Sequence, residues 1–120
     1  MNDYQMGVVE RRFAQIIWDR EPVSSALLAQ TALQELGWKK STTYTVLKRL
    51  CDKGIFQNEK GCVTSLLSKQ EFDALRSRRF VEETFDGSLP AFLAAFTSRK
   101  ALTDEEVAQL RQLIDGYKEG

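Results

Sequence analysis

The feature that most constrains the fold is the close spacing of helix-breaking residues in the first half of the chain. Glu21-Pro22, Gly37 and Gly54 divide this half into three short segments. A residue before proline avoids the helical conformation, and glycine readily takes the left-handed conformation that ends helices. Each segment carries apolar residues at helical spacing. The sequence therefore predicts three short helices with short connections, which favours a helix-turn-helix arrangement.

The three helices can be placed by their caps and apolar faces. We expect the first over residues 3–19, the second from Ser24 or Ser25 to Leu36, and the third from Ser41 or Thr42 to Gly54. The residues expected to face inward are Val9, Phe13, Ile16 and Ile17 in the first helix, Ala29, Leu33 and Leu36 in the second, and Val46, Leu47 and Leu50 in the third.

Residues 55–67 have a different pattern. Two short runs rich in apolar and β-branched residues flank Asn58-Glu59-Lys60-Gly61, and Gly61 can supply the positive φ of a hairpin loop. This predicts a two-stranded wing directly after the third helix, with an irregular loop as the alternative. The expected fold class is mainly α with a small β wing, in which residues 1–68 form a winged helix-turn-helix domain.

The remaining chain, residues 69–120, is predicted to be helical. Ser68 and Glu71 form a capping box for a helix that runs to about Phe85. Asp86-Gly87 breaks it, and Ser88 caps a short helix that tolerates Pro90 in its first turn. A second capping box, Thr103 to Glu106, opens the last helix.

These later helices expose apolar stripes that so short a segment cannot bury alone. We therefore expect residues 69–120 to dimerise with a second copy of the chain. The alternative is that the segment folds back onto its own first domain. The candidate interface residues are Phe80, Leu89, Phe92, Leu93, Phe96, Val107, Leu110, Ile114 and Tyr117.

Composition limits the possible functions. The chain has no histidine, which removes the commonest general base and metal ligand, and it matches no common catalytic motif. Two cysteines, Cys51 and Cys62, make neither a disulfide framework nor a zinc site. We expect a non-enzyme without metal or cofactor. The sequence has neither a signal peptide nor an apolar run long enough for a membrane span, so we expect a cytoplasmic protein.

Charge is unevenly distributed although the chain is neutral overall. Residues 39–60 contain six basic and two acidic residues, a net charge of +4 that the rest of the chain offsets. A polyanion would respond to this local block. The sequence thus predicts that the third helix and the wing bind double-stranded DNA, through Lys39, Lys40, Ser41, Thr42, Tyr44, Thr45, Lys48, Arg49 and Lys60.

The residue types suggest two different roles within that set. Serine and threonine hydroxyls can contact base edges or phosphates, and lysine and arginine neutralise phosphates. Three alternatives stay open. The third helix could be an ordinary solvated helix, the winged helix could bind protein instead of DNA, or Cys51 and Cys62 could form a redox switch.

The chain also resembles a known family. The pattern W-x-x-(S/T)-T-x-x-T-x-L-x-R-L-x-x-K-G from Trp38 to Gly54, with IIWDREPVSSALLAQ before it and GSLPAFLAAFTSRKALTDEEVAQLRQLI after it, is similar to the penicillinase-repressor (BlaI/MecI/CopY) family. The resemblance covers nearly the whole chain. It implies an N-terminal winged helix, a C-terminal dimerisation region and repression through a palindromic operator, with Ser41, Thr42, Tyr44 and Thr45 in the DNA-reading segment.

The resemblance also bears on how repression is relieved. The β-lactam branch of the family is inactivated by a regulatory protease at an Asn-Phe bond before the last helix, and the matching bond here is Ala95-Phe96, which lacks the asparagine. The copper-responsive branch ends in C-x-C motifs that bind Cu(I). This chain has no cysteine after Cys62, so copper sensing of that kind is not expected.

Overall fold

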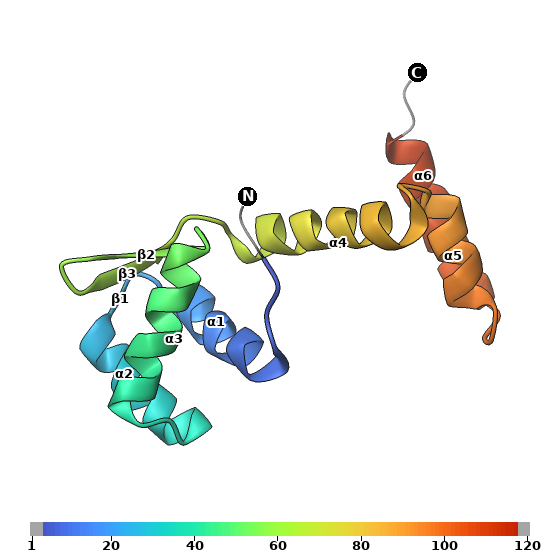
Figure 1. Cartoon of the computed structure of the whole chain (residues 1–120). Coiled ribbons are helices and arrows are strands. Elements are labelled where there is room, and N and C mark those ends of the chain that lie inside the picture. Colours follow the sequence, from blue (N-terminus) through green and yellow to red (C-terminus); the bar gives the residue numbers. More distant parts are fainter. Residues whose placement is uncertain (1–3, 118–120) are drawn as a thin grey trace. The chain divides into compact units, whose positions relative to one another are not determined.

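The computed structural model describes residues 4–117. Its elements are α1 (Val8–Arg20), β1 (Val23–Ser24), α2 (Ser25–Leu36), α3 (Lys40–Asp52), β2 (Phe56–Glu59), β3 (Cys62–Ser65), α4 (Lys69–Phe85), α5 (Leu89–Thr97) and α6 (Asp104–Tyr117) (Figure 1). The predicted fold class, mainly α with a small β wing, is confirmed. None of the helices in this described part combines the length and apolar character that crossing a bilayer demands.

The first helix starts later than predicted. Gly7 is its N-cap in an extended conformation and α1 begins at Val8, so the prediction of helix from residue 3 is wrong for residues 4–7; residue 3 itself lies outside the described residues. The ring of Tyr4 packs edge-on against Phe72, with ring centroids 6.2 Å apart. The extended start of the chain thus makes a tertiary contact that helical periodicity alone does not anticipate.

The second and third helices lie close to their predicted ranges. The Ser24 hydroxyl accepts a hydrogen bond from the Leu27 amide at 3.0 Å, and Gly37 ends α2 with a φ of 70°. At α3 the predicted caps are wrong. Lys39 is the N-cap without a side-chain hydrogen bond, so Ser41 and Thr42 lie inside the first turn and their side chains are exposed.

The wing is a hairpin within a three-stranded antiparallel sheet of order β1-β3-β2. Glu59 pairs with Cys62, and the two-residue loop between them has positive φ at Lys60 and Gly61, which is the backbone of a type I′ turn. The third strand is an addition to the prediction. Val23 pairs with Val63 and ties the start of α2 to the hairpin.

One hydrophobic core holds α1, α2, α3 and the sheet together. Phe13, Phe56 and Phe72 are its largest fully buried side chains. The prediction that Val9 and Leu33 face the core is wrong, because Val9 is 47% exposed and Leu33 is 60% exposed. Other residues of these helices are buried instead. They are Ala14 in α1, and Leu28, Thr31 and Ala32 in α2.

Threonine explains part of this difference. Thr31 is buried while its hydroxyl donates to the Leu27 carbonyl at 3.0 Å, and buried Thr43 donates to the Lys39 carbonyl at 3.4 Å. A hydroxyl satisfied by its own helix can enter a core at little cost. The inward face of α2 is therefore rotated away from Leu33.

The helix starts predicted for the later segment are confirmed. Ser68 and Glu71 exchange backbone-to-side-chain hydrogen bonds of 2.9 and 3.0 Å, and Thr103 and Glu106 do the same at 2.9 and 3.1 Å. The Ser88 hydroxyl accepts from the Ala91 amide at 3.1 Å. Local cap chemistry thus sets where α4, α5 and α6 begin.

The chain forms two compact units, one ending at Arg78 and the other beginning at Arg79. We call them the winged-helix unit and the C-terminal unit. The division falls inside α4, whereas the predicted domain boundary lies at residues 68/69 and stays a prediction. Phe72 is the buried residue of α4, and none of the described residues of α5 and α6 is buried.

Candidate nucleic-acid interface

The core of the winged-helix unit fixes the orientation of α3. Val46, Leu47 and Leu50 are buried as predicted, together with Thr43. The opposite face is polar and exposed, because helical periodicity places Ser41, Thr42, Thr45, Lys48 and Asp52 away from the core. The structure therefore brings together on one surface the hydroxyl residues predicted to contact DNA.

Thr45 is restrained by its own helix. Its hydroxyl donates to the Ser41 carbonyl at 2.9 Å and its side chain is exposed. This hydrogen bond uses the hydroxyl proton but leaves the oxygen free to accept and the methyl group free to pack. Such a threonine can accept from an amino group on a base edge or contact a thymine methyl.

Tyr44, which was predicted to contact DNA, also makes contacts within the protein. It is half-buried, its hydroxyl donates to the Ser25 hydroxyl at 3.4 Å, and the Lys40 ammonium lies 6.0 Å from its ring centroid. Tyr44 thus links α3 to the first residue of α2. This hydrogen bond joins the two helices of the helix-turn-helix at their polar edge.

The predicted phosphate-binding cations differ in their surroundings. Lys39, Lys40 and Lys60 are exposed. Lys48 lies 3.2 Å from Asp52 one turn later, but both side chains are more than two-thirds exposed, so this ion pair is weak and exchangeable. Arg49 instead lies 3.6 Å from Glu10 of α1, and its guanidinium is directed along the side of α3 that faces α1.

The wing turn is anchored next to the start of α2. The Gly61 carbonyl accepts from the Ser25 amide at 2.8 Å, and the Gly61 amide donates to the Asn58 side chain at 3.0 Å. Lys60 sits at the exposed corner of this turn with a φ of 53°. The loop therefore holds a cation at a defined distance from the helix-turn-helix rather than on a free arm.

A shallow hollow of about 370 Å³ separates α3 from the wing, lined by Tyr44, Leu47, Lys48, Cys51 and Asn58. Burial, and secondarily the Asp52 carboxylate, raise the pKa of the Cys51 thiol above its ordinary value. A protonated thiol is a poor nucleophile, which disfavours oxidation at Cys51. Cys62 is exposed on β3, and the redox switch stays an untested alternative.

Two residues of this surface were missed by the sequence analysis. Ser25 was considered only as a helix cap, and Asn58 only as part of a turn. Asn58 precedes the two-residue loop, where asparagine is common because its side chain can bond to the backbone two or three residues ahead. That local signal identifies the turn but says nothing of the neighbouring α3.

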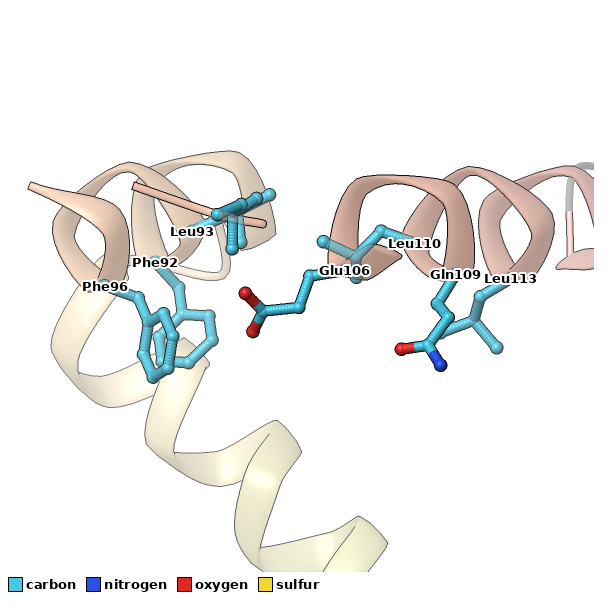
Figure 2. A pocket seen from close by; sticks show the side chains of 8 residues that line it. Phe92, Leu93, Phe96, Glu106, Gln109, Leu110 and Leu113 are labelled. Atoms are coloured by element: carbon cyan, nitrogen blue, oxygen red, sulfur yellow. The ribbon is translucent and has the colours of Figure 1, made fainter. Parts of the chain in front are cut away.

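The predicted dimer residues lie on exposed or half-buried faces of the C-terminal unit. Phe96 is 66% exposed, Ile114 is 59% exposed and Tyr117 is 81% exposed. An apolar groove of about 360 Å³ lies between α5 and α6, with Phe92 and Phe96 extending from one helix and Glu106, Gln109 and Leu110 from the other (Figure 2). Phe80, Phe85 and Phe92 form edge-to-face ring contacts with centroids 5.6–6.0 Å apart.

Comparison with known proteins agrees with the resemblance seen in the sequence. The family model described as penicillinase repressor matches residues 6–116. The penicillinase repressor of Bacillus licheniformis is 23% identical over 118 residues, covering 95% of this chain and 92% of its own length. The family match runs from before α1 to residue 116 in α6, and it therefore spans parts of both compact units. This chain belongs to the penicillinase repressor family.

Proposed function

We propose that this transcriptional repressor binds a two-fold symmetric DNA operator as a dimer, with α3 in the major groove. The observation that carries the proposal is the outer face of α3. It combines exposed hydroxyls near the helix start with flanking cations, on a helix that the core and Tyr44 hold in place. Short hydroxyl side chains near the start of a recognition helix suit contacts to base edges.

The cations have a separate role in this proposal. Lys39, Lys40 and Lys48 neutralise phosphates on either side of the groove, and Lys60 reaches a phosphate or minor groove beside it. Lys48 can exchange Asp52 for a phosphate because their ion pair is exposed. Arg49 contributes less, because Glu10 already lies beside its guanidinium.

Dimerisation is supported by the apolar surface of the C-terminal unit. Its helices carry large exposed side chains, such as Leu89, Phe96 and Ile114, and the described residues of α5 and α6 include none that is buried. Burial against a second copy would remove this surface from water. One winged helix alone offers a small interface, so pairing also increases affinity and specificity for DNA.

The alternative function, protein binding by the wing, has no comparable support. All exposed side chains within residues 39–60, every one of which the structure describes, are polar or charged. A protein-docking surface would expose an apolar patch there. The charge and polarity of this surface therefore favour nucleic acid.

Release of the operator by proteolysis at or near Ala95-Phe96 is not predicted by the sequence, which leaves the means of release open. This bond lies within α5, and the side chain of Phe96 is exposed. A protease must unfold a helical segment locally before it can cut there. The missing asparagine means that a protease specific for Asn-Phe would not recognise the bond.

Selection of duplexes from a random library with the full-length protein tests the proposed function. We expect enrichment of a sequence with two-fold symmetry, bound by two chains. The matched control is the same selection with Thr45→Ala, which should recover a sequence with weaker preference within each half-site. Enrichment of no sequence, or of one without symmetry, would refute the proposed function.

A further inference from the structure

Arg49 belongs to the outer face of α3 by its position in the helix, but its guanidinium has a partner in α1. Arg49 follows Thr45 by four residues, so at about 100° per residue its Cβ lies about 40° from that of Thr45 around the helix axis. Lys48 lies about 60° from Thr45 on the other side. Position alone would make Arg49 at least as suitable as Lys48 for contact with a phosphate. In the structure, however, Arg49 Nη1 lies 3.6 Å from Glu10 Oε1.

The ion pairs of these two cations differ in the exposure of the carboxylate. The side chain of Asp52, the partner of Lys48, is 67% exposed, whereas that of Glu10, the partner of Arg49, is 24% exposed. When Lys48 leaves Asp52 for a phosphate, water can solvate the free carboxylate. When Arg49 leaves Glu10, a carboxylate mostly covered by protein loses its counter-ion, which costs far more because water reaches it poorly.

Glu10 is incompletely satisfied even with Arg49 beside it. Its Oε2 is buried and has no hydrogen-bond partner among the described residues 4–117. The 3.6 Å distance from Arg49 to Oε1 is too long for a hydrogen bond, so Arg49 compensates Glu10 by its charge alone. A carboxylate placed for stability would have its buried oxygen hydrogen-bonded. The placement of Glu10 is therefore better explained by its effect on Arg49 than by stabilisation of the fold.

A second cation near α1 is also engaged within the protein. Lys53 follows the last residue of α3, and its ammonium donates to the Gln5 carbonyl at 2.6 Å. Lys39, Lys40 and Lys60, in contrast, are exposed. The cations near α1 are thus held by the protein, whereas those at the start of α3 and on the wing face solvent.

From these contacts we propose that Glu10 limits how strongly the protein binds DNA of any sequence, by holding Arg49 away from phosphate. The proposal rests on the proposed function, because it requires that α3 lies against DNA. A phosphate contact from Arg49 would carry no sequence information, so its release would strengthen binding to the operator and to unrelated DNA alike. Glu10 thereby restricts the sequence-independent part of the affinity without touching DNA itself.

The test measures binding of the full-length protein to a duplex of unrelated sequence at several salt concentrations. Glu10→Gln keeps the size of the side chain but removes its charge, which frees Arg49 to contact a phosphate. With two chains bound, the two added contacts should steepen the slope of log affinity against log salt by about 1.8 and strengthen binding roughly tenfold at about 0.1 M salt. The double variant Glu10→Gln/Arg49→Met should return slope and affinity to the wild-type values.

The matched control is Glu35→Gln. It changes the net charge equally and frees Arg20 from an ion pair of 3.2 Å, but neither residue lies in α3. Its affinity should stay within about threefold of wild type, because only the long-range field of the protein changes. Arg49→Met alone is a second test that does not depend on the folding of Glu10→Gln, and it should change the slope much less than Lys48→Ala does.

Three results would overturn this inference alone. They are equal binding by Glu10→Gln and Glu35→Gln, a gain in affinity that persists in the double variant, and a loss in Arg49→Met as large as that in Lys48→Ala. Failure of wild type to bind any duplex in a salt-dependent manner would overturn the proposed function as well.

Discussion

The two compact units differ in how they satisfy their apolar side chains. The winged-helix unit buries Phe13, Phe56 and Phe72 completely, so its fold is stabilised from within. The helices α5 and α6 of the C-terminal unit bury none of their described residues, and their phenylalanines and leucines lie at or near the surface. The first unit has a core of its own, whereas the second exposes the apolar side chains that would form the proposed dimer interface.

The largest expected effect comes from disrupting that interface. Ile114→Glu places a charge on the exposed apolar stripe of α6 and should convert dimers to monomers, lowering operator affinity by roughly 100-fold or more through lost avidity. Analytical ultracentrifugation and operator titration check both effects.

Leu33→Glu is the matched control, because Leu33 is 60% exposed on α2 and Ile114 is 59% exposed on α6. The control should remain dimeric. If both variants remain dimeric, the difference between the two units does not concern dimerisation.

A core truncation should affect the winged-helix unit most. Phe13→Ala leaves a cavity beside Trp38, whose ring centroid lies 5.1 Å away, and should reduce the free energy of unfolding by about 3–5 kcal/mol. Phe96→Ala should instead weaken the dimer with little change in the winged-helix unit. Urea titrations at two protein concentrations separate the two cases. If both variants lost the same unfolding free energy at both protein concentrations, the proposed difference between the two units would be contradicted.

Within the DNA-binding surface, two substitutions separate sequence reading from phosphate attraction. Thr45→Ala should cost about 1–3 kcal/mol at one operator position and relax the preference there. Lys48→Ala should weaken all sequences equally and reduce the salt dependence of binding. Competition titrations with single-base operator variants measure both. If both variants lost the same affinity for every operator sequence, Thr45 would not contact a base.

The smallest expected effect is on the stability of the fold at acid pH. Hydrogen bonds from Ser68 lower the pKa of Glu71, and those from Thr103 lower that of Glu106, both below the ordinary value of 4.5. A lowered folded pKa adds stability that is present above pH 4.5 and is lost as pH falls through the folded value.

Replacing Glu71 by Gln should therefore lower the thermal midpoint slightly at neutral pH and not at all once the carboxylate is protonated. Thermal unfolding between about pH 7 and about pH 3 measures this convergence. Glu106→Gln is the parallel variant in the C-terminal unit. A Glu71→Gln difference that grows toward acid pH would have the wrong sign for this linkage.

Local signals predicted most of the fold. Serine caps located α2 and α5, capping boxes located α4 and α6, and Gly61 indicated the hairpin loop. The errors occurred where tertiary contacts decide. Val9 of α1 and Leu33 of α2 are exposed, and the buried positions on these helices include Ala14 in α1 and Thr31 and Ala32 in α2. The two-residue strand β1 is too short to show a period of its own.

The candidate site was predictable in its composition but not in its contacts. The outer face of α3 followed from helical spacing, which fixes the residues that share a face. The contacts of Tyr44 with Ser25, Arg49 with Glu10 and Arg11 with Asp73 join elements that are distant in sequence. Nothing in a single sequence indicates such pairings, because they depend on how the helices pack.

Dependence of operator affinity on salt concentration tests the central claim most directly. A dimer that makes about eight phosphate contacts should give a slope of about −7 when the logarithm of affinity is plotted against that of salt concentration. The measurement requires the selected palindrome and the full-length protein. A slope near −7 supports DNA binding by two basic α3 and wing surfaces, whereas a slope near zero would contradict it.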